Sequence, residues 1–216
     1  MEVTATKRLR GLLCLLLCML IAAGCLPAQA DTIPQPTLSP DAAEYDSDHP
    51  ELLEEEQLYA ASAILIEASS GMVIFEKDAD TIRYPASTTK IMTVMLGIIM
   101  IDPNDYDKEV MVSERAVQVP EDSSTMDLKA GEVLSYRDLL YGTMLLSAND
   151  GSNVIAETVS GSIEAFVQLM NDKAAELGCT NTHFANPHGY HDDDHYTTAR
   201  DLALIAQAAM QVDLFR

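Results

Sequence analysis

The chain has 216 residues, a length that suits one compact domain with short appendages. Hydrophobic residues make up 48% of it, which is enough for a buried core and excludes a wholly disordered chain. The formal net charge of −21 repels a phosphate backbone, so we expect no nucleic-acid partner.

Residues 1–30 have the pattern of a secretory signal peptide. A positive start (Lys7, Arg8 and Arg10) precedes an apolar run at 12–23, and the sequence Ala28-Gln29-Ala30 is typical of a cleavage site. The apolar run is short for a membrane span. The pattern predicts an exported, extracytoplasmic protein of the cell envelope, at the outer face of the cytoplasmic membrane or in the periplasm, whose mature chain begins at Asp31.

Two other interpretations of this start stay open. Cys25 follows Ala22-Ala23-Gly24, which is similar to a lipoprotein box, and an uncleaved start could hold the chain at the membrane surface. The cysteines at 14, 18 and 25 all lie within the signal, so only Cys179 remains after cleavage. We expect Cys179 to be a small buried residue without a disulfide.

The segment 31–57 is predicted to be a linker, and the folded domain is placed at 58–216. Between Asp31 and Glu56 the chain has several prolines and nine acidic residues but no Lys or Arg. Such a composition stays solvated.

The domain is predicted to begin with two strands and a buried helix. Residues 63–67 and 72–76 are strand-like, and the turn at 69–71 between them predicts a hairpin. Residues 87–100 are predicted to form a helix that is apolar nearly all round and is therefore expected to be buried. Asp102-Pro103-Asn104 ends this helix.

The later elements are mostly helical. A short strand is expected at 110–112, a polar loop from 113 to 124, and a turn at 128–132. Ser135 is typical of a helix start, and that helix runs to Leu146. Further helices are predicted at 151–159, 162–177 with Gly178 as its cap, and 199–211, with a loop at 181–197.

Ser87-Thr88-Thr89-Lys90 opens the apolar helix and could be catalytic. Side chains three positions apart share a helix face, so Ser87 and Lys90 are neighbours. A serine hydroxyl needs a base to become a nucleophile, and a lysine buried against this helix would have a lowered pKa. Backbone N–H groups at the helix start could hold an oxyanion. The same residues also fit an ordinary start in which Ser87 caps the helix and Lys90 faces solvent.

Ser147-Ala148-Asn149 is the second candidate group, at the end of another apolar helix. Ser147 could relay a proton between Lys90 and a leaving group, and Asn149 could hold a substrate amide or the Lys90 amine. The alternative is a helix cap followed by an ordinary turn. Asp150 is expected to cap the next helix rather than to act as a catalytic acid.

These two groups and several further segments, in the same order, resemble the low-molecular-mass penicillin-binding serine D-Ala-D-Ala carboxypeptidases of peptidase family S11. The likeness runs from about Leu58 to the C-terminus. The segments that carry it are 85–93 (PASTTKIMT), 145–150 (LLSAND), 177–184 (LGCTNTHF), 186–189 (NPHG) and 195–201 (HYTTARD).

The resemblance implies both a fold and a site. The fold is α+β, a penicillin-binding, β-lactamase-like α–β sandwich in which helices flank an antiparallel sheet. Ser87 is implied to be the nucleophile that forms the acyl ester, Lys90 the general base, Ser147 the proton relay and Asn149 a substrate-binding residue. The implied partners are a peptidoglycan stem peptide ending in D-Ala-D-Ala and the β-lactams that acylate Ser87. No metal or organic cofactor is implied.

One departure from the family pattern leaves alternatives open. The third family motif, Lys-Thr-Gly, does not occur, and the last lysine is Lys173. We expect the strand that carries it, and the remaining strands of the sheet, to lie beyond Arg216. A serine β-lactamase shares the Ser–Lys pair but usually has S-D-N where this chain has Ser147-Ala148-Asn149. An inactive wall-binding remnant is the other alternative.

A second cluster could bind a metal ion and would make the chain an exported metal-binding protein. Its members are His183, His188, His191, Asp192, Asp193, Asp194 and His195. The matched segments favour a structured loop beside the active-site helices instead. The loop from Val119 to Met126 is a further hypothesis: it borders the active site and affects deacylation.

Overall fold

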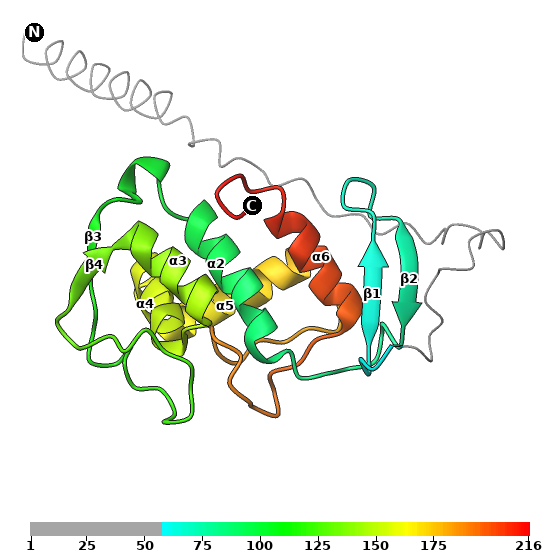
Figure 1. The fold of residues 1–216 in the computed structure, drawn as a ribbon, viewed down its shortest axis with the longest axis horizontal. Helices are drawn as coiled ribbons and strands as arrows, with labels where there is room; N and C mark the ends of the chain where they lie inside the picture. The colour runs from blue at the N-terminus through cyan, green and yellow to red at the C-terminus, as the bar shows by residue number, and fades with distance from the viewer. Residues whose placement is uncertain (1–57) are drawn as a thin grey trace, which may run out of the picture. The chain divides into compact units, whose positions relative to one another are not determined.

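A computed structural model describes residues 58–216 (Figure 1). The predicted signal peptide at 1–30 and the predicted linker at 31–57 lie outside the described residues. Within 58–216, no helix is both long and apolar enough to cross a membrane.

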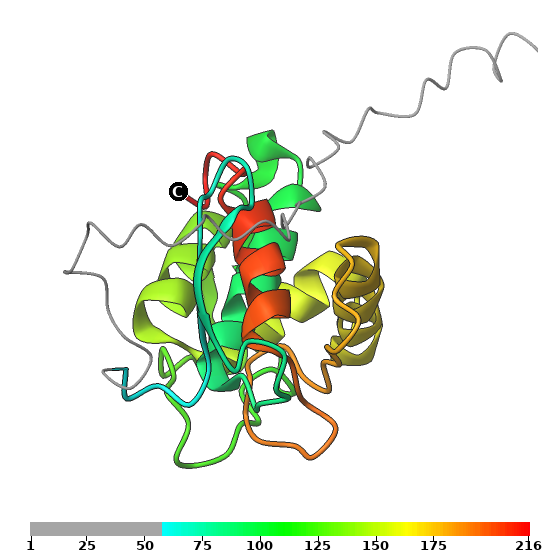
Figure 2. The same cartoon turned by 90° about the vertical axis from the view of Figure 1, so that its right-hand side faces the viewer.

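Strands β1 (Ala63–Ile66) and β2 (Val73–Lys77) form the predicted antiparallel hairpin. The Glu67 side chain shapes the turn between them, because its carboxylate accepts hydrogen bonds from the backbone N–H groups of Ser69 and Ser70. The hairpin packs against helix α6 (Ala199–Ala209) through β1. Figure 2, viewed from the hairpin side, shows β1 and β2 in front of α6.

Helix α2 (Lys90–Ile99) lies at the centre of the helical part and contacts α3, α4, α5 and α6 (Figure 1). Its residues from Met92 to Ile98 are all buried, as the all-round apolar sequence predicted. The surrounding helices are α3 (Tyr136–Leu146), α4 (Asn149–Ser160) and α5 (Ile163–Glu176). A helix enclosed in this way holds its first residue, Lys90, away from water.

The helix caps follow the sequence. Ser135, Ser162 and Thr198 each accept a hydrogen bond from the backbone N–H three residues later, at the starts of α3, α5 and α6. Gly178, with φ of 81°, follows α5 in the left-handed conformation expected of a C-terminal cap.

Several boundaries differ from the prediction. Residues Ala86–Thr89 form a 3₁₀ turn, so the α-helix begins only at Lys90. Helix α4 begins at Asn149 rather than 151, and Ala148 is the residue that precedes it. Asp150 is therefore not the cap that was expected.

The sheet prediction was incomplete. The short strand β3 (Glu109–Met111) was expected near 110–112, but its partner β4 (Val133–Ser135) was not. Within residues 58–216 the strands form two separate two-stranded antiparallel sheets. A short 3₁₀ turn (Pro103–Asp105) follows α2, where Asp102, Pro103 and Asn104 were predicted to end it. The α+β class is confirmed.

Candidate active site

Ser87 is exposed in the 3₁₀ turn that leads into α2. The preceding residue, Ala86, has φ of 49°, in the left-handed region that residues other than glycine seldom adopt. Pro85 is the residue that precedes the turn, and no side chain caps it. The interpretation of Ser87 as an ordinary helix cap is therefore wrong.

Lys90 lies beneath Ser87 and is only 2% exposed, which overturns the interpretation of a solvated lysine. Its Nζ atom lies 3.3 Å from Ser87 Oγ, 2.8 Å from Asn149 Oδ1 and 2.7 Å from the backbone oxygen of His188. Burial lowers the pKa of Lys90 from 10.5 to about 8, because the charged amine loses its hydration.

This geometry suits proton transfer from Ser87 to Lys90. Asn149 Oδ1 and His188 O can only accept, so each takes one N–H of the Lys90 amine. The third tetrahedral position of Nζ faces Ser87 Oγ. In the neutral amine that position can hold the lone pair, which can accept the Ser87 proton.

Asn149 occupies the first position of α4, and its side chain links Lys90 to a neighbouring loop. Its Oδ1 accepts from Lys90, while its Nδ2 donates to Ser123 Oγ at 3.0 Å. Of the two roles weighed for Asn149, contact with the Lys90 amine is the one the structure shows.

Ser147 ends α3 in the left-handed conformation, with φ of 57°. It lies two residues before Asn149 in the chain. Among the described residues its hydroxyl makes no hydrogen bond, so its role as a relay stays a prediction.

The segment 186–190 is held against the Ser87 turn. The carbonyl oxygen of Pro187 accepts from Thr93 Oγ1 at 2.5 Å, and that of His188 accepts from Lys90. At Gly189, with φ of 88°, an added Cβ atom would lie 1.8 Å from the carbonyl oxygen of Ala86. Only glycine permits this approach.

The His195 ring links the turn that contains Ser87 to the 181–197 loop through two hydrogen bonds. Its Nδ1 accepts the backbone N–H of Ala185 at 3.0 Å, so the ring proton must sit on Nε2, which donates to Thr89 Oγ1 at 2.7 Å. Burial lowers the pKa of His195 to about 4, which keeps the ring neutral near pH 7. Burial, with the charge of Lys90, lowers the pKa of His188 to about 4 as well.

Asp150 anchors the loop on the other side of the site. Its buried carboxylate accepts from the backbone N–H groups of Met126 and Leu128 at 3.0–3.2 Å. The backbone N–H of Asn149 donates to Ser124 O at 2.8 Å. The loop from Val119 to Met126 therefore borders the site, as predicted.

The His and Asp cluster is dispersed rather than convergent. His183 Nδ1 contacts the backbone oxygen of Asp194, His195 contacts Thr89, and His191 lies 3.6 Å from Asp193 at the surface. Within residues 58–216, no three His, Cys, Asp or Glu side chains form a group that could hold a metal ion.

Cys179 is buried, and burial raises the pKa of its thiol to about 12. The thiol therefore stays protonated and donates to the backbone oxygen of Asp201 at 3.5 Å. This is the structural role that the sequence predicted.

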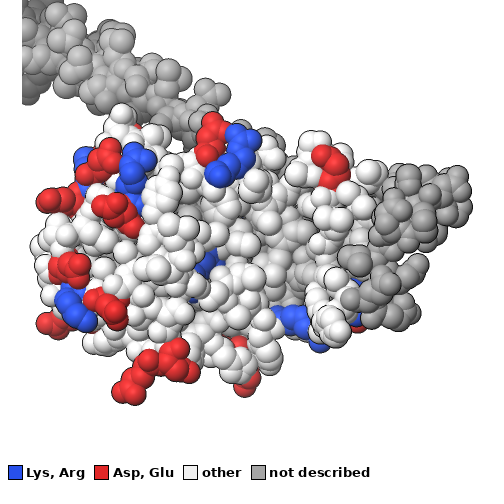
Figure 3. All heavy atoms as spheres, in the orientation of Figure 1, with Lys and Arg blue, Asp and Glu red and all other residues white. Residues whose placement is uncertain are grey.

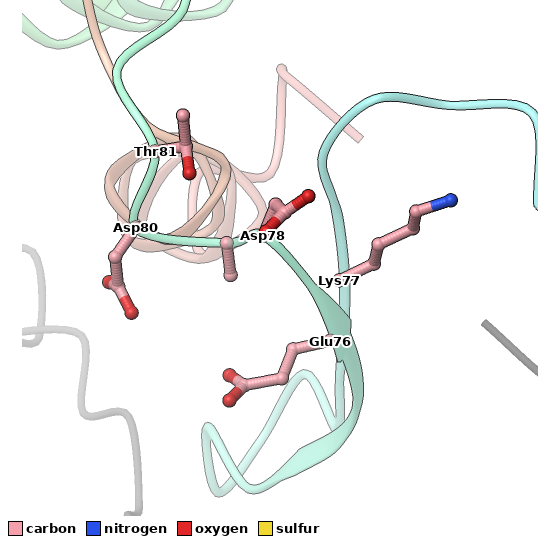
Figure 4. Close-up of a pocket in the computed structure, with 6 residues that line it drawn as sticks. Glu76, Lys77, Asp78, Asp80 and Thr81 are labelled. Carbon is pink, nitrogen blue, oxygen red and sulfur yellow. The ribbon is translucent and has the colours of Figure 1, made fainter.

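A hollow of about 420 Å³ lies elsewhere on the domain and contains none of the candidate residues (Figure 4). Its lining is Glu76, Lys77, Asp78, Ala79, Asp80 and Thr81. Arg200 already pairs with two of its carboxylates, those of Glu76 and Asp80, at 2.6 and 2.7 Å. Figure 3 shows a largely uncharged central area, with most of the charged side chains placed around it, often with opposite charges adjacent.

Sequence reasoning named Ser87, Lys90 and Asn149, which the structure brings together, but missed the backbone partner of Lys90. The carbonyl oxygen of His188 carries no residue-type signal, since every residue has one. The glycine in Asn186-Pro187-His188-Gly189 was the available hint, because an isolated glycine often marks a close approach of backbone.

Comparison with known proteins supports the family resemblance. The family model described as D-alanyl-D-alanine carboxypeptidase, Peptidase S11, matches residues 49–215. The chain is 38% identical over 156 residues to D-alanyl-D-alanine carboxypeptidase DacF of Bacillus subtilis, covering 71% of this chain and 40% of that protein. It is also 38% identical over 161 residues to DacA of Escherichia coli, covering 72% and 40%.

Solved structures agree. The D-alanyl-D-alanine carboxypeptidase DacD from Francisella tularensis matches with a TM-score of 0.66 and 37% identity, covering 71% of this chain and 37% of that one. Penicillin binding protein 6B from Escherichia coli matches with a TM-score of 0.71 and 30% identity, covering 81% and 56%. The chain spans about 40% of the length of the curated relatives named above. With a family model matched over most of its described residues, the chain belongs to the D-alanyl-D-alanine carboxypeptidase family, peptidase S11.

Proposed function

We propose that this protein is a serine D-Ala-D-Ala carboxypeptidase that removes the terminal D-alanine from peptidoglycan stem peptides. The observation that carries the proposal is the buried Lys90 amine, which has its pKa lowered to about 8 and lies 3.3 Å from the exposed Ser87 hydroxyl. A nucleophile and a base in contact, with the base oriented by further groups, is the arrangement that acyl transfer requires.

The reaction begins with a proton transfer. Lys90 Nζ takes the Ser87 proton as Oγ attacks the carbonyl carbon between the two D-alanines. The C–N bond then breaks, and the leaving amine takes a proton that Lys90 returns, directly or through Ser147. Water hydrolyses the Ser87 ester, which releases the shortened peptide and restores the hydroxyl. Asn149 Oδ1 holds the Lys90 amine through a hydrogen bond of 2.8 Å.

A β-lactam would follow the same first step and leave a longer-lived ester on Ser87. The family match and the similarity to a solved penicillin binding protein support this part of the proposal. We further propose that residues 58–216 belong to the catalytic domain, and that the protein is exported by residues 1–30 and works at the cell envelope, at or near the membrane surface and without a nucleic-acid partner.

Labelling with a fluorescent penicillin tests the proposal. The natural full-length protein should take up one acyl group, and peptide mapping should place it on Ser87. Ser87→Ala should abolish labelling. Ser113→Ala, which changes a serine two residues after strand β3, should not. A label on another residue, or no label on a folded protein, would contradict the mechanism. Rapid hydrolysis of penicillin with many turnovers would favour the β-lactamase alternative.

A further inference from the structure

One side-chain contact joins the two loops that flank the candidate active site. Tyr190 Oη donates to Asp122 Oδ1 at 3.0 Å, across 68 positions of sequence. Both residues are exposed. Nothing in the proposed chemistry uses either of them.

Asp122 belongs to the loop that touches Asn149, which we name the 119–126 loop. The next two residues bind Asn149 directly: Ser123 Oγ accepts from its Nδ2 at 3.0 Å, and Ser124 O accepts from its backbone N–H at 2.8 Å. The Asn149 Oδ1 atom is one of the two acceptors that orient Lys90. A displacement of Asp122 would therefore move Asn149 Oδ1, one of the two acceptors of the Lys90 amine.

Tyr190 belongs to the 186–190 loop, which supplies the other acceptor. This loop is a tight unit, because Asn186 Oδ1 accepts from the backbone of Gly189 at 2.7 Å and Asn186 Nδ2 donates to Tyr190 O at 2.9 Å. The backbone N–H of Tyr190 also donates to His188 Nδ1 at 3.1 Å. A displacement of Tyr190 is therefore passed to His188 O, 2.7 Å from Lys90 Nζ.

We propose that the Asp122–Tyr190 hydrogen bond is a positioning contact, which closes a ring of contacts around Lys90 and so speeds acylation of Ser87. The inference rests on the proposed function. Asp122 and Tyr190 do not touch the reacting atoms; they act through Asn149 and His188. A small displacement of a general base slows the reaction strongly. A contact that fixes both acceptors of Lys90 therefore affects the acylation rate more than the stability of the fold.

The expected effect is modest and specific. Loss of one exposed hydrogen bond changes little in the core, so Tyr190→Phe should leave the melting temperature within a degree or two of wild type. The rate constant for Ser87 acylation should fall about two- to tenfold, the range that one hydrogen bond supplies. Asp122→Ala should have the same effect, and Asp122→Asn, which keeps an acceptor oxygen, should restore most of the rate.

The experiment measures acylation and deacylation rates with a fluorescent penicillin on the natural full-length protein and its variants, with melting temperatures alongside. The matched control is Tyr141→Phe, an exposed tyrosine on α3 that should acylate like wild type. The double variant Tyr190→Phe with Asp122→Ala should be no slower than the slower single variant, because both remove one bond.

Three results from the variants would overturn the inference on its own. Wild-type acylation in Tyr190→Phe would show that the bond has no catalytic effect. Additive losses in the double variant, or a loss of rate that tracks a loss of melting temperature, would show that the residues act separately or only stabilise the fold. If wild-type protein were not labelled at Ser87, the proposed function itself would fall, and this inference with it.

Discussion

Two regions of the domain hold a lysine among polar residues, and they differ in how far their residues are buried. The Lys90 side chain is buried, and its Nζ atom makes the contacts with Asn149 and His188. In the hollow beside β2 the lining is mostly exposed, and Figure 4 shows Lys77 pointing away from the carboxylates of Glu76 and Asp80. The lowered pKa of Lys90 therefore arises from loss of water around its amine.

The largest effect should separate these two lysines. Lys90→Ala should slow Ser87 acylation by about a thousandfold, because a general base contributes about 10²–10⁴. Lys77→Ala, the matched control in the hollow, should change the rate less than twofold. Stopped-flow acylation measurements on the three proteins make the test. Near-normal acylation by Lys90→Ala would remove the base from the mechanism.

Glycine 189 tests whether the close backbone approach beneath Ser87 matters. Gly189→Ala puts a Cβ atom 1.8 Å from Ala86 O, so the Ser87 turn must move. We expect a loss of about 2–4 kcal/mol in the free energy of unfolding and at least tenfold slower acylation. Gly178→Ala is the control, since its φ is also positive but its Cβ would meet nothing within 4 Å.

For Gly178→Ala we expect a cost of about 1 kcal/mol from the backbone alone, with acylation preserved. Urea titrations give the stabilities and penicillin labelling gives the rates. Equal destabilisation by the two substitutions would show that the 186–190 loop can move away from Ala86 at little cost in the free energy of unfolding.

Asn149→Asp should favour the protonated form of Lys90 and so slow the acylation of Ser87 at pH 7. The new carboxylate would lie at the 2.8 Å contact with Lys90 Nζ and favour the protonated amine. The apparent pKa for acylation should rise by about one unit or more, and the rate at pH 7 should fall about tenfold. Asn104→Asp, beyond the other end of α2, adds the same charge and should leave the pH profile in place.

His195 predicts a smaller, pH-dependent effect on stability. Its pKa in the folded protein is about 4, below the ordinary 6.5, so the unfolded chain binds the extra proton between these values. Stability from this group is complete above pH 6.5 and is lost as the pH falls toward 4. His195→Gln should therefore lose about 1–3 kcal/mol less than wild type between pH 6.5 and 4 in urea titrations. Identical pH dependence would mean that His195 is not buried in neutral form.

The sequence predicted the local elements and the closeness of Ser87 to Lys90 because both depend on short spacings. The hairpin, the buried helix and the Ser87–Lys90 pair follow from hydrophobic pattern and from neighbours three positions apart. Strand β4 was missed because its three residues merge with the helix start at Ser135. The left-handed Ala86 was missed because alanine carries no signal for that conformation.

Most contacts across the chain were beyond reach for a different reason. Contact with Lys90 was one of two roles weighed for Asn149, but no pattern in one sequence encodes the contact of Lys90 with His188, 98 positions away. The same holds for Asp122 and Tyr190. The His and Asp cluster shows the converse, since closeness in sequence suggested a metal site that the loop geometry disperses.

The most direct test of the central claim is the pKa of the Lys90 amine itself. The protein labelled with ¹³C at the lysine ε-carbon can be titrated by NMR, with the Lys90 signal assigned through its loss in Lys90→Arg. We predict a midpoint of about 8, because burial is what prepares this amine to accept the Ser87 proton. A midpoint near 10.5, the ordinary value, would mean that the amine is hydrated and would contradict the account.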